Sequence, residues 1–296
     1  MFADATIDFL HHRHAQDAPF FASCSFMVPH DPRTMPDKYL GLYPSAEVEL
    51  PDNFLPEHPF DNGELMIRDE VLAGHPRGED ETRQHLAAYY AMITHLDHEV
   101  GRVLSAIDEA GLRQDTRIVF ASDNGLAVGQ HGLFGKQSVY DHSVHVPLIF
   151  AGPDIPEGQQ RDALAGLIDI FPTLCDLVDV DIPESVEGCS LVPSLDDEEE
   201  SLREHFFYTY RHLMRAVRDE AGLKLIETGT GEQRHTQLFD LAEDPLEMTD
   251  LSEPPEMAEG LSALRDALRA GWCDEVGNTE KVQGQQFWEQ MEWTQA

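Results

Sequence analysis

The sequence is poor in lysine and cysteine, and it contains no long apolar run. Its 20 lysine and arginine residues face 56 aspartate and glutamate residues, which gives a net charge of −36. Such a surface lacks the basic patches that bind nucleic-acid phosphates, and anionic lipids repel it. We therefore expect neither a nucleic-acid partner nor a membrane partner. Because the acidic residues are spread along the whole chain, we interpret them as a halophilic surface rather than as a site for many cations.

The few cysteines and the start of the chain exclude further classes. The four cysteines show neither CxxC pairing nor zinc-ligand spacing, which argues against a disulfide framework and against a zinc finger. No run is long enough and apolar enough to span a membrane. Residues 1–4 lack the basic start of a signal peptide. Taken as written, the chain is predicted to be soluble and cytoplasmic, and the alternative is that its true N-terminus is missing.

The segment from Ser122 to Lys136 concentrates the chemistry of the chain. It follows an apolar, β-branched run at residues 116–121 that predicts a buried strand. Asp123 and Asn124 thus stand at the carboxyl end of a strand, and their oxygens suit Ca²⁺, with Mg²⁺ as the alternative. Lys136 beside a divalent cation can hold a tetrahedral oxyanion. Asp-Asn-Gly is also a common turn, which is the purely structural interpretation.

Hydrophobic periodicity predicts alternating helices and strands. The predicted helices cover residues 4–14, 81–110 and 258–272, with one more starting at residue 167. The predicted strands cover residues 20–28, 116–121, 146–150, 206–210 and 223–226. This order indicates an α/β fold with a parallel-rich sheet.

An acidic run at residues 196–200 is typical of a solvated linker. It divides the chain into a main α/β domain (1–195), a C-terminal subdomain (201–272) and a polar tail (273–296).

Three strings resemble the sulfatases of the alkaline phosphatase superfamily. The most specific is Ser122–Pro153 (SDNGLAVGQHGLFGKQSVYDHSVHVPLIFAGP), which resembles their C-terminal signature. The others are residues 85–112 (HLAAYYAMITHLDHEVGRVLSAIDEAGL) and 237–247 (QLFDLAEDPLE). The resemblance covers about residues 4 to 265. It implies an alkaline-phosphatase-like sheet flanked by helices, incomplete at its N-terminus, with a small C-terminal α+β subdomain.

Two family elements are missing from this sequence. One is the strand ending in an Asp-Asp pair that completes the calcium shell, and the other is the C/S-x-P-x-R motif, whose Cys or Ser becomes the formylglycine nucleophile. None of the four cysteines stands in such a motif. The resemblance therefore predicts the later portion of a sulfatase, from a truncated, split or mis-started gene. It predicts no activity for the chain alone, and it makes a separate N-terminal chain a candidate partner.

The resemblance also implies roles for five residues. His30, in its Pro-His-Asp-Pro context after the predicted strand, and Lys136 would be catalytic and would hold sulfate oxygens. His131 would contact the substrate with them, and Asp123 and Asn124 would bind Ca²⁺. The implied substrate is a sulfated small molecule or carbohydrate.

Three alternatives stay open. Tetrahedral oxyanions look alike to a lysine–metal site, so a phosphate or phosphonate ester hydrolase of the same superfamily is the first. The second is a zinc site using His142 and His145, although Asn124 stands where zinc-dependent relatives usually carry a histidine. The third is a non-catalytic remnant that binds anions or a partner chain.

Overall fold

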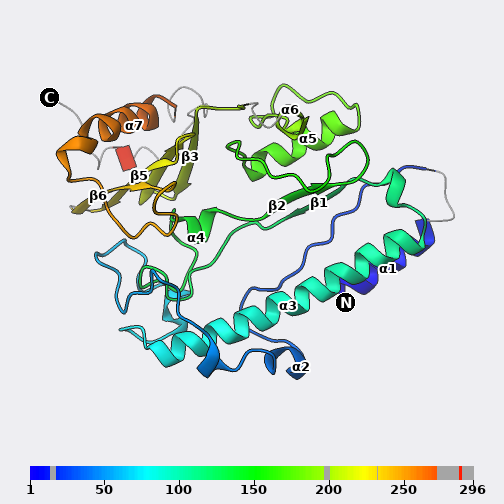
Figure 1. Cartoon of the computed structure of the whole chain (residues 1–296), viewed down its shortest axis with the longest axis horizontal. Coiled ribbons are helices and arrows are strands. Elements are labelled where there is room, and N and C mark those ends of the chain that lie inside the picture. Colours follow the sequence, from blue (N-terminus) through cyan, green and yellow to red (C-terminus); the bar gives the residue numbers. More distant parts are fainter. Residues whose placement is uncertain (14–17, 197–200, 232, 272–286, 289–296) are drawn as a thin grey trace. The chain divides into compact units, whose positions relative to one another are not determined.

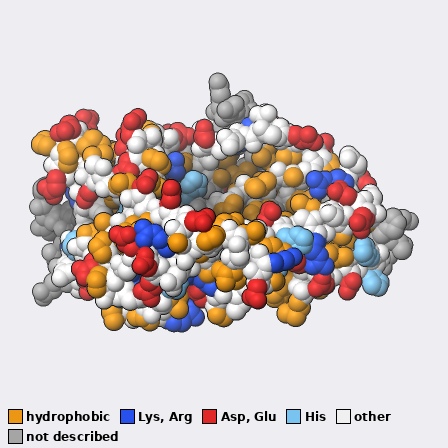
Figure 2. Space-filling model, turned by 60° about the horizontal axis from the view of Figure 1, so that its bottom comes forward, with side chains coloured by type: hydrophobic (Ala, Val, Ile, Leu, Met, Phe, Trp, Pro, Cys, Tyr) orange, Lys and Arg blue, Asp and Glu red, His pale blue; other side chains and the backbone are white. Residues whose placement is uncertain are grey.

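The computed structural model describes residues 1–13, 18–196, 201–231, 233–271 and 287–288 (Figure 1). The chain forms two compact units. Unit 1 comprises Met1–Pro51, Ala73–Val119 and Phe150–Ile155, and unit 2 comprises Asp52–Leu72, Phe120–Ile149 and Pro156–Ala296. Acidic side chains are scattered over the face shown in Figure 2, interspersed with apolar ones, and do not gather into one patch there.

Unit 1 is built on two packed helices, α1 (Phe2–Arg13) and α3 (Glu79–Glu109). Acidic residues fill the first turn of α3, where the helix dipole favours negative charge. Leu10 of α1 packs on Ala106 and Ile107 of α3, and Arg102 pairs with Asp4 at 2.6 Å. Both predicted helices are thereby confirmed. The remaining short elements of the unit are α2 (Asp37–Leu40), η1 (Ser45–Glu47) and η3 (Arg113–Asp115).

The predicted strand at residues 20–28 is wrong. The segment runs as a smooth tube in Figure 1, and no described segment pairs with it as a strand. Phe21 is 80 % exposed and Met27 is 67 % exposed, so the apolar run is not buried. A strand needs a neighbour to satisfy its backbone N–H and C=O groups, and local apolarity does not supply that neighbour.

A two-stranded sheet joins β1 (Ile118–Ala121) and β2 (Leu148–Ala151). Ser122 N donates to Pro147 O at 3.3 Å beyond one end of the pair, and Gly152 lies against Thr116 and Arg117 at the other. The strands therefore run antiparallel, and both predicted strands are confirmed. The expected parallel-rich sheet is not found among the described residues. Parallel neighbours need a crossover connection, whereas the chain after β1 returns to the same end of the pair.

Unit 2 contains a four-stranded antiparallel sheet in the order β3-β4-β5-β6. Its strands are β3 (His205–Tyr210), β4 (Met214–Asp219), β5 (Leu223–Thr230) and β6 (Gln233–Asp240). On one face, α7 (Ala258–Ala270) packs Leu264 and Leu268 on the sheet. These elements lie within the predicted C-terminal subdomain, whose boundaries stay a prediction. The predicted acidic linker and polar tail fall mostly outside the described residues.

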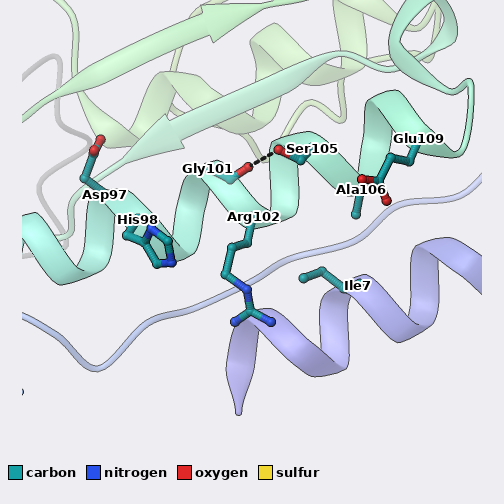
Figure 3. A pocket seen from close by; sticks show the side chains of 8 residues that line it. All are labelled: Ile7, Asp97, His98, Gly101, Arg102, Ser105, Ala106 and Glu109. Atoms are coloured by element: carbon teal, nitrogen blue, oxygen red, sulfur yellow. Dashed lines mark hydrogen bonds between the residues drawn. The ribbon is translucent and has the colours of Figure 1, made fainter. Parts of the chain in front are cut away.

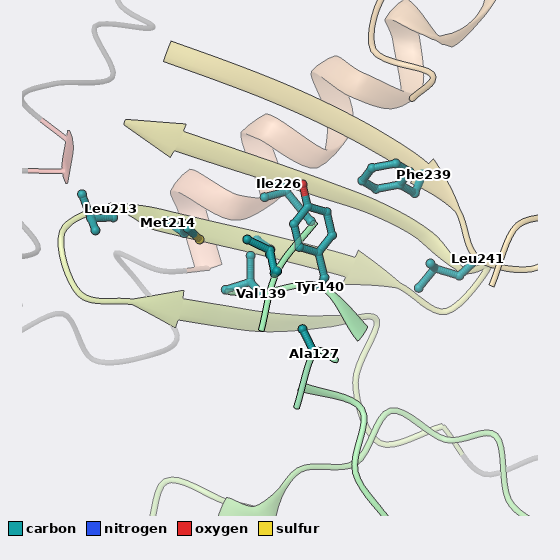
Figure 4. Packing of buried hydrophobic residues seen from close by; sticks show 10 residues of the cluster. Ala127, Val139, Tyr140, Leu213, Met214, Ile226, Phe239 and Leu241 are labelled. Atoms are coloured by element: carbon teal, nitrogen blue, oxygen red, sulfur yellow. The ribbon is translucent and has the colours of Figure 1, made fainter. Parts of the chain in front are cut away.

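The opposite face of this sheet holds the chemistry-bearing segment. Ala127 of that segment, with Val139 and Tyr140 just after it, packs in a cluster that includes Met214 and Phe239 (Figure 4). The segment is thereby fixed to a rigid layer rather than left as a free loop. The other short elements of unit 2 are η2 (Glu70–Leu72), α4 (Asp141–Val144), η4 (Leu167–Asp169), α5 (Ile170–Leu177), α6 (Val192–Asp196) and η5 (Pro255–Met257). Within the described ranges, no helix combines the length and apolarity that crossing a membrane requires.

Candidate functional site

The loop from Ser122 to Lys136 closes on itself by backbone hydrogen bonds. Ala127 N donates to Gly135 O at 2.9 Å, and Gly129 N donates to Leu133 O at 2.8 Å. The closure returns Lys136, the residue after Gly135, to the part of the chain that follows Asn124. The predicted approach of the Lys136 ammonium to the Asp123–Asn124 pair stays a prediction.

The Asp123–Asn124 pair presents oxygen atoms at the start of this loop. Asp123 is exposed, while Asn124 Nδ2 donates to Gly125 O at 2.7 Å and leaves the amide oxygen as the free end. Gly125 N donates to Ser143 O at 2.9 Å, and a Cβ on Gly125 would overlap the carbonyl oxygen of His142. Gly125 is therefore required for close packing of the loop.

These donors suit Ca²⁺ in kind but not in number. Carboxylate and amide oxygens are the ligands that Ca²⁺ takes, yet the ion takes about six to eight of them. Asp123 and Asn124 supply only two side chains, and among the described residues no group of three or more His, Cys, Asp or Glu side chains is arranged to hold a metal. His142 and His145, the pair considered for zinc, likewise belong to no such group among the described residues.

His131 is buried inside unit 2 rather than exposed at its surface. It is 7 % exposed, its ring stacks on Tyr140 at 4.3 Å, and Asn53 Nδ2 donates to its Nε2 at 3.3 Å. Burial lowers the pKa of His131 to about 4, and it does the same for His58, whose Nδ1 donates to His131 O. Burial also lowers the pKa of the neighbouring His142. At neutral pH these rings are uncharged. His131 therefore contributes packing contacts and no positive charge.

His30 is exposed in a turn of unit 1, whereas the other four predicted residues belong to unit 2. Its Nδ1 lies 2.8 Å from Asp31 O. Because a carbonyl only accepts, Nδ1 carries the proton and Nε2 is the acceptor of the neutral ring. The convergence of His30 with the loop stays a prediction.

A cavity of about 570 Å³ lies elsewhere, between α1 and α3 of unit 1 (Figure 3). Its lining includes Ile7, His98, Arg102 and Ser105, and none of the five predicted site residues. Arg102 is already paired with Glu99 at 2.6 Å and with Asp4 of α1. The cavity is therefore not a candidate for the chemistry.

A buried charge cluster anchors the chain that follows the loop. Lys224 is fully buried, and its Nζ lies 2.6 Å from Asp141 Oδ1 and 2.7 Å from Glu247 Oε1. Glu247 Oε2 also accepts from Asp141 N at 2.7 Å. Burial opposes the charge of Lys224, but the two carboxylates outweigh it and raise its pKa. No short motif indicates this contact, because its members are far apart in the chain.

Comparisons with known proteins point in one direction. The sulfatase family model matches residues 1–180, and the model of the N-sulphoglucosamine sulphohydrolase C-terminal region matches residues 129–271. An arylsulfatase of Clostridium perfringens is 33 % identical over 274 residues, which cover 89 % of this chain and 55 % of that protein. The chain thus spans about half the length of this relative.

Solved structures share the fold. A protein solved in complex with its substrate D-glucosamine-2-N,6-O-disulfate has a TM-score of 0.80 at 21 % identity, with 94 % of this chain and 70 % of that chain covered. The phosphonate monoester hydrolase of Agrobacterium radiobacter has a TM-score of 0.77 at 25 % identity, with 91 % of this chain and 60 % of that chain covered. These likenesses agree with the expected alkaline-phosphatase-like α/β fold.

Proposed function

Because the chain belongs to the sulfatase family, we propose that its loop from Ser122 to Lys136 is the oxyanion-binding part of a sulfate ester hydrolase site. The observation that carries this proposal is the closure of the loop by the bond from Ala127 N to Gly135 O. The closure returns the backbone at Lys136 to the part of the chain that follows Asp123 and Asn124. An ammonium group together with a carboxylate and an amide oxygen suits a sulfate group and its counter-cation.

Each residue has a distinct part in the proposed site. The Lys136 ammonium donates to sulfate oxygens and offsets the charge that develops on them. His30 belongs to unit 1, and its role as a sulfate ligand or proton donor stays a prediction. Asp123 and Asn124 would contribute two of the oxygen ligands of Ca²⁺, which would supply positive charge at the sulfate. We assign no contact to His131, because its buried ring is held by Tyr140 and Asn53.

The nucleophile of the family is formylglycine, and the C/S-x-P-x-R motif that carries it is absent from these 296 residues. We therefore propose that the chain binds the sulfate group but does not turn over a sulfate ester by itself. The nucleophile and the remaining calcium ligands would come from outside these 296 residues. The substrate class is a sulfated small molecule or carbohydrate.

A second candidate is hydrolysis of phosphate or phosphonate esters. The likeness to a phosphonate monoester hydrolase favours it, and a tetrahedral oxyanion of either kind fits a lysine–cation pair. Competition between inorganic sulfate and inorganic phosphate for the loop separates the two.

The experiment uses the full chain labelled with ¹³C at lysine Cε. The sequence has only four lysines, so each signal can be assigned by substitution. Inorganic sulfate should shift the Lys136 signal, and Lys136→Ala should weaken sulfate binding by about 10- to 100-fold, as expected for a charge-assisted hydrogen bond. Lys38→Ala, a change at an exposed lysine of unit 1, should leave the affinity unchanged.

Two results would reject the proposal. One is equal sulfate affinity for the parent chain and for Lys136→Ala. The other is robust hydrolysis of an aryl sulfate by the purified 296-residue chain, which would mean that the nucleophile lies within it. Tighter binding of phosphate than of sulfate at Lys136 would favour the second candidate.

A further inference from the structure

A buried carboxylate of unit 2 holds the backbone just before Lys136. Glu70 is 3 % exposed and stands at the start of η2. Its Oε2 accepts from Phe134 N at 2.9 Å, and its Oε1 accepts from Gly135 N at 2.8 Å. Hydrogen bonds to an ionised acceptor are about twice as strong as neutral ones. One side chain thus fixes two successive peptide groups of the loop.

Gly135 is shaped to this contact. A Cβ at this position would lie 2.8 Å from Glu70 Oε1 and would overlap Oε1 of Gln137. The carbonyl of Gly135 accepts from Ala127 N at 2.9 Å. The residue that leads into Lys136 is therefore held on its N–H side by Glu70 and on its C=O side by the opposite limb of the loop.

The neighbouring carboxylate extends the same support to Lys136 itself. Asp69 is 6 % exposed, and its Oδ2 accepts from Gln137 Nε2 at 2.8 Å. Gln137 Oε1 in turn accepts from Lys136 N at 2.9 Å. Arg68 Nε donates to the other oxygen of Asp69 at 2.7 Å and keeps that carboxylate in place. Residues 69 and 70 thus hold three successive backbone N–H groups, two directly and the third through Gln137.

The electrostatics of Asp69 agree with this arrangement. Burial raises the pKa of Asp69, but the hydrogen bonds from Gln137 and Arg68, together with the charges of Arg68 and Lys136, lower it overall. The carboxylate is therefore ionised at neutral pH and lies within electrostatic reach of the Lys136 ammonium.

We propose that Asp69 and Glu70 form a clamp, which positions Lys136 for contact with an oxyanion. The clamp rests on the proposed function, since it acts through Lys136 and touches no substrate itself. Its advantage is geometric, because an ammonium on a long flexible side chain loses less freedom on binding when its backbone is already fixed. A displacement of about 1 Å at such a group can cost on the order of 100-fold in activity.

The test compares Glu70→Gln with a matched control, Glu64→Gln, in the full chain. Glu64 is a buried carboxylate of the same segment, but it pairs with Arg211 at 2.9 Å and does not bind the loop. The amide of Glu70→Gln would face one of the two loop N–H groups donor to donor. We expect this variant to bind inorganic sulfate about 10-fold or more weakly and to move the Lys136 ¹³Cε signal in the absence of sulfate. Glu64→Gln should do neither.

A second variant covers the case in which Glu70→Gln does not fold. Gln137→Ala removes the link between Asp69 and Lys136 N while Arg68 still pairs with Asp69. The loss of one hydrogen bond should weaken sulfate binding by about fivefold and again move the Lys136 signal.

The outcomes separate the clamp from the function. If Lys136→Ala abolishes sulfate binding while Gln137→Ala and any folded Glu70→Gln protein bind it like Glu64→Gln, the clamp is rejected and the proposed function stands. If Lys136→Ala does not weaken binding, the proposed function fails and the clamp fails with it. Weaker binding and a displaced Lys136 signal in the clamp variants, but not in the control, support the clamp.

Discussion

The cluster around Lys224 offers a sharp test of how the loop is anchored. Lys224→Met would leave Asp141 and Glu247 facing each other in the interior without the ammonium that lies 2.6 and 2.7 Å from them. Breaking a buried ion pair by removing one partner costs about 3–5 kcal/mol. Because domains are stable by about 5–15 kcal/mol in all, this one change should remove a large share of the free energy of unfolding.

Urea unfolding followed by circular dichroism, at neutral pH and fixed salt, measures this loss. The control is Lys38→Met. Lys38 is exposed, and its Nζ lies 4.6 Å from the centroid of the Tyr39 ring. Its cost should stay below about 1 kcal/mol. Adding Glu247→Gln to Lys224→Met should restore part of the loss, since one buried charge disappears. The reasoning is refuted if Lys224→Met lowers stability no more than Lys38→Met with an unchanged m-value.

Three further predictions follow from buried or crowded positions and from composition. His58 and His131 have pKa values of about 4 in the folded protein against an ordinary 6.5, so the unfolded chain binds more protons between these values. The free energy of unfolding should therefore fall as the pH drops from about 6.5 to 4, and unfolding curves over that range that do not move would contradict this. Gly125→Ala should cost about 1–3 kcal/mol, because its Cβ would overlap His142 O, whereas Gly101→Ala in α3 meets nothing within 4 Å and should be neutral or stabilising in the same unfolding assay. With a net charge of −36, the protein should lose melting temperature when salt is dialysed away, and a melting temperature indifferent to molar salt would reject the halophilic interpretation.

Local pattern predicted the helices well and the sheet less well. The expected helix at residues 81–110 forms as Glu79–Glu109, because its apolar residues repeat at helical spacing over many turns. Residues 20–28 are as apolar as a strand but find no strand partner in the described chain. The strand β4 was not predicted, because arginines interrupt its apolar residues. Pairing, unlike helix formation, depends on segments that the local sequence does not contain.

The same division applies to the candidate site. Asp123, Asn124 and Lys136 could be selected from one short string, and the loop closure brings that string together. The residues that support the loop could not be selected from the sequence. Glu70, for example, is 64 positions before Phe134, and no short motif joins them. Lys224, likewise, is 83 positions after Asp141. The role of a buried charged side chain depends on its partners, and those partners become its neighbours only in the folded chain.

The acidic composition and the proposed anion-binding role of the loop are compatible for a physical reason. At low ionic strength a net charge of −36 repels any sulfate ester from a distance, which disfavours encounter. In about 1 M salt the Debye length is about 3 Å, so that long-range repulsion disappears while a contact at hydrogen-bond distance survives. A lysine that works under such screening gains little from long-range attraction and depends on being held in the right place. The support that Asp69 and Glu70 give to the backbone at Lys136 meets that requirement.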